Sequence, residues 1–234
     1  MWLLNSSIGK KLIMSISGIF LVLFLLFHLS MNVAAVFSEE AYNVICAFLG
    51  ANWYAVAATA VLAAGFVIHI LYAFMLTLQN QKARGNDKYA VNTRPKGVEW
   101  ASQNMLVLGI VVVGFLLLHF SQFWYKMMFA ELLGNHEVEL GGLMVSPQDG
   151  AAFIRFYFSN IVIVVLYLVW YAALWFHLTH GFWSAIQTIG WNNTVWFNRW
   201  KCISDIFAAV VCLGFAVVTI AFYLKSLCAA GACC

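Results

Sequence analysis

Four histidines, each placed in a different long apolar segment, are the residues of this chain whose type and spacing point to chemistry. They are His28, His69, His119 and His177. An imidazole deep in hydrocarbon is costly and is therefore usually functional. Neutral imidazole is also the natural axial ligand of haem iron, and two of them on facing helices make a bis-histidine site. The four histidines together predict two haems stacked across a membrane.

The elements that carry these histidines must be membrane-spanning helices. Of the 234 residues, 64% are hydrophobic and only 9% are charged, which is too little polar surface for a water-soluble protein. Five apolar stretches each reach the roughly 18–20 residues that one span requires. We therefore expect an all-α integral membrane protein, with residues 1–234 forming a single transmembrane cytochrome b domain bundled around two b-type haems. The five helices are predicted near residues 12–37, 53–79, 102–126, 156–184 and 204–225.

Two of the apolar stretches exceed the length of one span. Their excess, Ala41–Asn52 and Ser184–Asn198, is expected to lie along the membrane interface as short amphipathic pieces. The first stretch is too long for a secretory signal and carries a histidine, so we expect it to be retained as a helix.

The distribution of basic residues predicts the orientation. With the N-terminus inside, nine of the twelve Lys and Arg residues fall on the inner side. Only Lys126, Arg155 and Lys225 fall outside. This positive-inside bias predicts a cytoplasmic N-terminus and an external C-terminus. None of the six cysteines forms C-x-x-C or C-x-x-C-H, so the sequence supports neither a zinc or iron–sulfur site nor covalent c-type haem attachment.

Counting along the helices assigns the histidines to two depths. At about 1.5 Å per residue, His28 and His119 lie about 25 Å from the inner surface. His69 and His177 lie about 18 Å from it. The first predicted helix should therefore pair with the third at an outer haem, and the second with the fourth at an inner haem.

Residues near these histidines suit a flat macrocycle. Gly65 lies four residues before His69, and Gly181 lies four residues after His177, so both share a helical face with a ligand. A missing side chain there lets a porphyrin approach the backbone. Arg155, at the outer start of the fourth helix, either pairs with the propionates of the outer haem or is an ordinary interfacial arginine.

Polar neighbours could orient the imidazoles. Asn32 lies one turn after His28, and Gln122 lies close to one turn after His119, where each could act as a hydrogen-bond partner. His180 lies one turn after His177 and leaves three readings open. It could replace that ligand, line a quinone pocket or bond a neighbouring helix.

With these residues in place, the chain resembles the single-chain, di-haem cytochrome b subunit of succinate dehydrogenase and fumarate reductase. The resemblance covers essentially the whole length and rests on five helices with ligand histidines in the first four. It also rests on H-x-x-x-N at His28–Asn32, on H-x-x-x-G at His177–Gly181, and on the continuation over residues 182–190.

The resemblance implies a larger complex. In that family a flavoprotein subunit interconverts succinate and fumarate, and an iron–sulfur subunit connects it to the membrane subunit, which exchanges electrons with quinone. The cytoplasmic loop Gln79–Gln103, rich in Lys and Arg, is the natural docking surface for the soluble partners, a set of charges that fixes the topology, or both. Di-haem members commonly use menaquinone, rather than ubiquinone, near the outer haem. The implied surroundings are the lipids of a bacterial inner membrane, with no nucleic acid.

One position departs from part of the family. Certain members have a glutamate two residues before the ligand of the fourth helix, proposed as a proton route across the membrane. This chain has Trp175 there, which puts such a route in doubt.

Two other readings remain open. A cytochrome b anchor of another quinone-linked dehydrogenase or of a hydrogenase would carry the same haems. A transporter that relays protons through buried histidines would need broken helices and carboxylates at mid-membrane. The only Asp or Glu in the predicted spans is Asp205, at the very start of the fifth, and none lies at mid-membrane, which disfavours the transporter.

Overall fold

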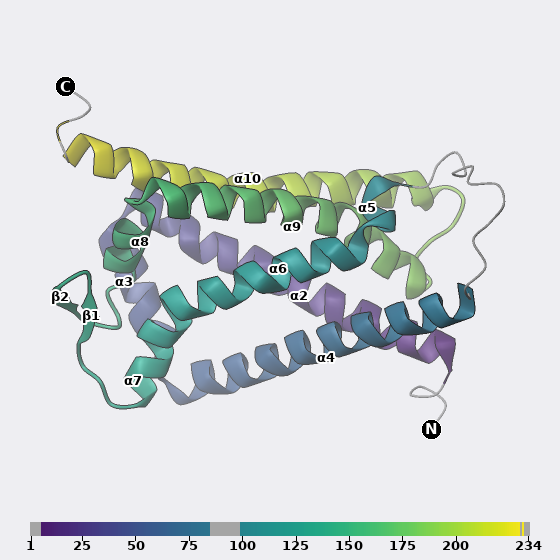
Figure 1. The fold of residues 1–234 in the computed structure, drawn as a ribbon, viewed down its shortest axis with the longest axis horizontal. Helices are drawn as coiled ribbons and strands as arrows, with labels where there is room; N and C mark the ends of the chain where they lie inside the picture. Colours follow the sequence, from purple (N-terminus) through teal and green to yellow (C-terminus); the bar gives the residue numbers. More distant parts are fainter. Residues whose placement is uncertain (1–5, 85–98, 230, 232–234) are drawn as a thin grey trace.

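The computed structural model describes residues 6–84, 99–229 and 231, and the chain is almost entirely helical (Figure 1). The elements, in chain order, are α2 (Ser7–Phe37), α3 (Glu39–Phe48), α4 (Trp53–Arg84), α5 (Trp100–Gln103), α6 (Met105–His119), the π-helical segment η1 (Phe120–Phe129), α7 (Ala130–Leu132), β1 (Val138–Leu140), β2 (Leu143–Val145), α8 (Gly150–Phe158), α9 (Ile161–Thr188) and α10 (Trp196–Ala229).

Five continuous helical stretches are long and apolar enough to cross a membrane, which confirms the predicted all-α multi-pass architecture. They are Ser7–Phe37, Trp53–Ala83, Met105–Leu132, Ile161–Thr188 and Trp196–Ala229. The third stretch combines α6, η1 and α7, because the helix continues from one into the next without a break.

The spanning helices form a bundle with two distinct ends (Figure 1). One end, named here the hairpin end, carries α3, α7, the β1–β2 hairpin and α8; the other, the α5 end, carries α5 and the start of α2. Helices α9 and α10 run side by side, and α2 packs against both of them as well as against α4. Helix α6 packs mainly on α9. The helices that carry the four histidines are therefore neighbours in space.

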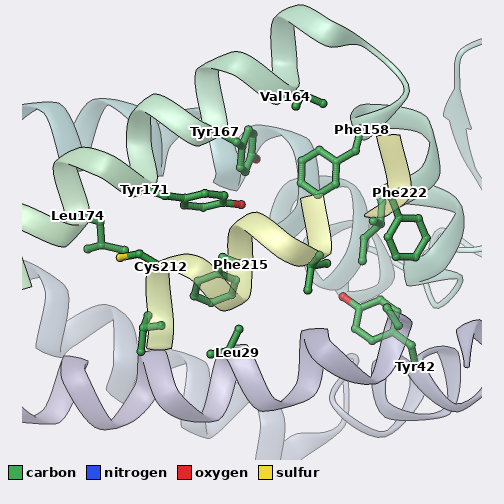
Figure 2. Packing of buried hydrophobic residues seen from close by; sticks show 14 of the residues in the cluster. Leu29, Tyr42, Phe158, Val164, Tyr167, Tyr171, Leu174, Cys212, Phe215 and Phe222 are labelled. Carbon is green, nitrogen blue, oxygen red and sulfur yellow. The ribbon is translucent and has the colours of Figure 1, made fainter. Parts of the chain in front are cut away.

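Aromatic and aliphatic side chains fill the contact between α9, α10 and α2 (Figure 2). Tyr167 and Tyr171 of α9 lie next to each other, and Phe215 of α10 stacks on Tyr171 with ring centroids 5.9 Å apart. Leu29 of α2 contributes to the same cluster. Helix α4 lies outside this core, and no residue of its most apolar stretch is buried. We expect membrane lipid to contact the unburied apolar side chains of α4.

Polar side chains cap the helices at two breaks in the chain. The Ser38 side chain accepts a hydrogen bond from the Ala41 backbone, so α3 begins where α2 ends. Helix α2 ends at Phe37, as predicted, and the short piece expected at Ala41–Asn52 is helix α3, shifted to Glu39–Phe48. The Asn160 side chain caps α9 in the same way, so the predicted helix 156–184 is in fact the end of α8 followed by α9.

The expected interfacial segment Ser184–Asn198 does not form a separate piece. Helix α9 continues through its first part to Thr188, Gly190 turns the chain with a φ of 89°, and α10 begins at Trp196. The fifth spanning helix therefore starts eight residues earlier than the predicted start at residue 204.

Close packing of α2 on α10 gives the first prediction. A Cβ atom at Gly214 would lie 2.8 Å from both terminal methyl groups of Leu29. We expect Gly214→Val to destabilise the bundle by about 1–3 kcal/mol through overpacking, measured as a lower Tm in detergent. The same substitution at Gly114 is the control, because no described atom lies within 4 Å of a Cβ there. Equal melting of the two variants would contradict this packing.

Candidate functional site

A cavity of about 1250 Å³ lies inside the bundle, and all four histidines line it. Its walls come mainly from α2, α4, α6 and α9, with further residues from α3, η1, α8 and α10, and they are largely apolar. Pockets for one drug-sized ligand have volumes of roughly 300–1,000 Å³. The cavity is therefore large enough for more than one small ligand, and it offers few polar groups besides the imidazoles.

The imidazoles meet in two pairs along this cavity. The ring centroids of His28 on α2 and His119 on α6 are 5.8 Å apart. Those of His69 on α4 and His177 on α9 are 6.4 Å apart. The first spanning helix thus meets the third, and the second meets the fourth, which is the pairing expected from the depth count.

These separations match what a shared metal ion requires. An iron bonded to one nitrogen of each ring, at about 2 Å per bond, places the two centroids about 6 Å apart. In the part of the chain that the structure describes, no group of three or more His, Cys, Asp or Glu side chains is arranged to hold a metal. Each histidine pair could hold a metal only if other donors complete the coordination, as the four nitrogens of a porphyrin do.

Hydroxyl groups contact one imidazole of each pair. Ser17 Oγ lies 3.3 Å from Nδ1 of His69. The Tyr167 hydroxyl lies 3.4 Å from Nδ1 of His119 and donates a hydrogen bond of 2.7 Å to Gln122 Oε1. Gln122 therefore reaches its histidine through Tyr167. Both contacts use Nδ1, which leaves Nε2 of each ring available for another partner.

The other imidazole of each pair has a weaker hydrogen-bond partner at Nδ1, or none. Asn32 lies beside His28 as expected, with its Nδ2 atom 3.5 Å from Nδ1, but it donates its shorter bond, 2.8 Å, to the His28 carbonyl. Its Oδ1 accepts a hydrogen bond from Tyr42. Nδ1 of His177 is buried and has no hydrogen-bond partner among the described residues.

The glycines nearest the imidazoles are only partly those that the spacing suggested. A Cβ at Gly18 would lie 3.3 Å from His69 Cε1, and one at Gly109 would lie 3.8 Å from His177 Cε1. Gly181 lines the cavity, as expected. Gly65 instead packs on an aromatic ring, because a Cβ there would lie 2.7 Å from Phe20.

Arg155 belongs to an ion-pair group at the hairpin end. Its guanidinium pairs with Glu39, and Lys225 pairs with the same carboxylate at 3.3 Å. Arg155 is not among the residues that line the cavity. Contact with haem propionates therefore remains a prediction that requires Arg155 to leave or share its present partner.

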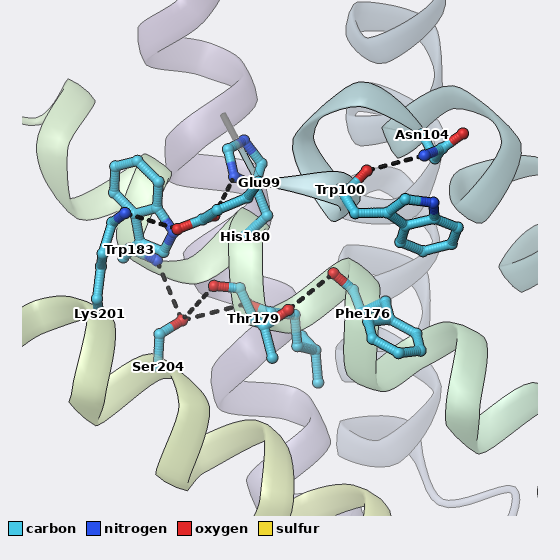
Figure 3. Close-up of polar contacts among 10 residues, drawn as sticks. Glu99, Trp100, Asn104, Phe176, Thr179, His180, Trp183, Lys201 and Ser204 are labelled. Atoms are coloured by element: carbon cyan, nitrogen blue, oxygen red, sulfur yellow. Dashed lines mark hydrogen bonds and ion pairs between the residues drawn. The ribbon is translucent and has the colours of Figure 1, made fainter. Parts of the chain in front are cut away.

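His180 binds a carboxylate at the α5 end (Figure 3). Its Nδ1 atom lies 3.1 Å from Glu99, and Lys201 Nζ lies 2.6 Å from the other oxygen of the same carboxylate. The Lys201 ammonium also lies over the Trp183 ring, 4.7 Å from its centroid. His180 lines the cavity but belongs to neither histidine pair. The geometry thus favours His177 over His180 as the partner of His69.

This cluster alters the acidity of its carboxyl group. Burial disfavours the charged form of Glu99, but hydrogen bonds from Lys201 and His180 outweigh burial and hold its pKa below the ordinary value of 4.5. The carboxylate links the chain just before α5 to α9 and α10, and so closes this end of the bundle.

Several residues of the site were not singled out from the sequence, although some signals existed. Ser17 lies eleven residues before His28, three helical turns away and on the same face. Trp170, whose ring centroid is 5.7 Å from that of His119, lies two turns before His177 on one face. The roles of Glu99 and Tyr167 could not be predicted from sequence spacing, because their partners are distant in the sequence.

The predicted docking loop Gln79–Gln103 lies mostly outside the described residues, which resume at Glu99. Lys82 is exposed near the end of α4. Comparisons of the chain with protein-family models, with curated proteins and with solved structures gave no match. The proposals below therefore depend on the residues of the chain itself.

The Glu99 cluster gives a prediction about pH. A folded-state pKa below the unfolded one means that ionised Glu99 stabilises the fold above the unfolded value, and that this contribution is lost as pH falls through the folded value. We expect Tm to decline less in Glu99→Gln than in the wild-type protein below about pH 4.5. Glu40→Gln, an exposed site on α3, is the control. Parallel Tm profiles for wild type and Glu99→Gln would contradict this role.

Proposed function

We propose that this protein is the membrane anchor and quinone-reactive electron-transfer subunit of a succinate:quinone oxidoreductase or quinol:fumarate reductase. The observation that carries the proposal is the presence of two histidine pairs, at the separation of an iron-bridged site, along one apolar cavity. Two non-covalent b haems would be held by His28 with His119 and by His69 with His177.

The residues present fit this cofactor. The cavity volume, the small residues Gly18 and Gly109 beside the inner pair, and the lack of other metal-binding groups among the described residues all suit a flat ring that brings its own four nitrogens. When bound, each haem supplies an iron centre that accepts and returns one electron.

The chain itself performs three tasks in this proposal. The four imidazoles fix the position of the metal, because each is carried by a different helix of a packed bundle. The aromatic core of α9 and α10 excludes water from one side of the cavity. Ion pairs at Glu39 and Glu99 tie the segments at the two ends together.

The choice of partner enzyme rests on the resemblance. The ordered motifs His28–Asn32 and His177–Gly181 both border the cavity, and the basic loop following α4 offers a surface for an iron–sulfur subunit and its flavoprotein. Quinone, with menaquinone as the expected type, would react near the outer pair at the hairpin end.

Loss of single ligands tests the haem assignment. The wild-type protein should contain two haems b per chain in a pyridine haemochrome assay. Replacement of any one of the four paired histidines by Ala should reduce this to one, because the site then loses one of the two side chains that would hold its haem. His180→Ala should retain two, as should His136→Ala, whose side chain is exposed in the loop between α7 and β1. Loss of haem in His180→Ala, with two haems kept in His177→Ala, would contradict the pairing.

Isolation of the native complex tests the partner. An affinity tag at the C-terminus should copurify a flavoprotein and an iron–sulfur protein, with succinate reducing the haems in the purified complex. Copurification of a hydrogenase or another dehydrogenase, with both haems present, would overturn the choice of enzyme and leave the haem sites standing.

A further inference from the structure

Each histidine pair contains one imidazole that faces a hydroxyl group whose own proton is used elsewhere. Ser17 donates its proton to the Met14 carbonyl at 3.0 Å, so towards Nδ1 of His69 its oxygen accepts. Tyr167 donates to Gln122 Oε1 at 2.7 Å, so towards Nδ1 of His119 its oxygen also accepts.

An accepting oxygen at Nδ1 decides which ring nitrogen carries the proton. A neutral imidazole has one N–H and one lone pair, and the hydrogen bond made by one nitrogen fixes the state of the other. With the proton on Nδ1, the lone pair is on Nε2, the nitrogen that the hydroxyl contact leaves available. This is the tautomer that metal binding requires.

We propose that Ser17 and Tyr167 are positioning residues that hold His69 and His119 in this tautomer and set the reduction potentials of the two haems separately. The inference rests on the proposed haem sites. A hydrogen bond from the outer nitrogen raises the basicity of an imidazole ligand, and a more basic ligand favours ferric over ferrous iron. Each hydroxyl therefore lowers the potential of the haem beside it.

Burial makes these hydroxyl groups hard to replace. Ser17 is 7% exposed, Tyr167 is 2% exposed and Gln122 is 6% exposed, so water has little access to their positions. Removal of a buried acceptor leaves the N–H group without a partner.

The arrangement also makes the two ligands of each pair unequal. Asn32 presents an amide nitrogen, itself a donor, to Nδ1 of His28, and Nδ1 of His177 has no described partner. A single hydroxyl thus acts on each haem, and the two hydroxyls come from different helices, α2 and α9.

The test is a spectroscopic redox titration of the two-haem protein. Tyr167→Phe should raise the midpoint potential of one haem transition, and Ser17→Ala should raise that of the other.

Tyr171→Phe is the matched control for Tyr167→Phe, because Tyr171 is one turn away on α9, is similarly buried and bonds Thr219 instead of a histidine. Ser15→Ala is the control for Ser17→Ala, because Ser15 is buried on the same helix. Ser17→Thr, which keeps the hydroxyl, should restore the wild-type potential.

A second variant keeps the test decisive if Tyr167→Phe fails to assemble. Gln122→Leu frees the Tyr167 proton and should shift the same transition as Tyr167→Phe. In a Tyr167→Phe/Gln122→Leu double variant that assembles, the shift in midpoint potential should equal that of Tyr167→Phe alone, because Gln122 acts through Tyr167.

The outcomes separate this inference from the proposed function. Unchanged potentials in variants that retain both haems would overturn the role of the hydroxyls, as would shifts of equal size in the control variants. A wild-type protein without two haems would instead overturn the proposed function itself.

Discussion

An imidazole inside hydrocarbon has two nitrogens that need partners and no water to supply them, and this constraint organises the structure. The chain meets it by placing four such rings on four helices and directing them at one another in pairs. One nitrogen of His69 and one of His119 meet a hydroxyl oxygen, and all four rings line the cavity. A metal held between the rings of a pair would satisfy one further nitrogen of each without bringing any charged side chain into the membrane.

The rest of the bundle holds these pairs at their separation. Helices α9 and α10 form the rigid side, with stacked aromatic rings between them and α2 packed closely at Gly214. Helix α4 is held mainly through α2 and buries none of its most apolar stretch. Helix α4 carries His69 on the more open side of the cavity. A large planar ligand bound there would supply contacts that the protein alone does not make. At the ends, Glu39 and Glu99 each bind two basic groups, which ties α3, α8 and α10 at one end and α5, α9 and α10 at the other.

The features predictable from the sequence were those fixed by distance along a helix. Residue counts placed His28 level with His119 and His69 level with His177, because a helix converts sequence number directly into depth. Features set by contacts between distant segments were not predictable: Gly65 packs on Phe20, Arg155 meets Glu39, and Tyr167 links Gln122 to His119. The break at Asn160 depends on a single capping side chain within an apolar run, where hydropathy gives no boundary, whereas the end of the first helix was predictable because Glu39 and Glu40 follow it. The π-helical segment after His119, which continues the third span towards Leu132, has no sequence signature either.

The most direct test of the central claim is an experimental density map of the protein purified from its native membrane without added cofactor. The account predicts two flat densities inside the bundle, one bridging His28 and His119 and the other bridging His69 and His177, with Nε2 of each ring directed at the centre of a plane. A map in which lipid or side chains fill the cavity, or in which either histidine pair bonds directly without a group between the rings, would contradict it.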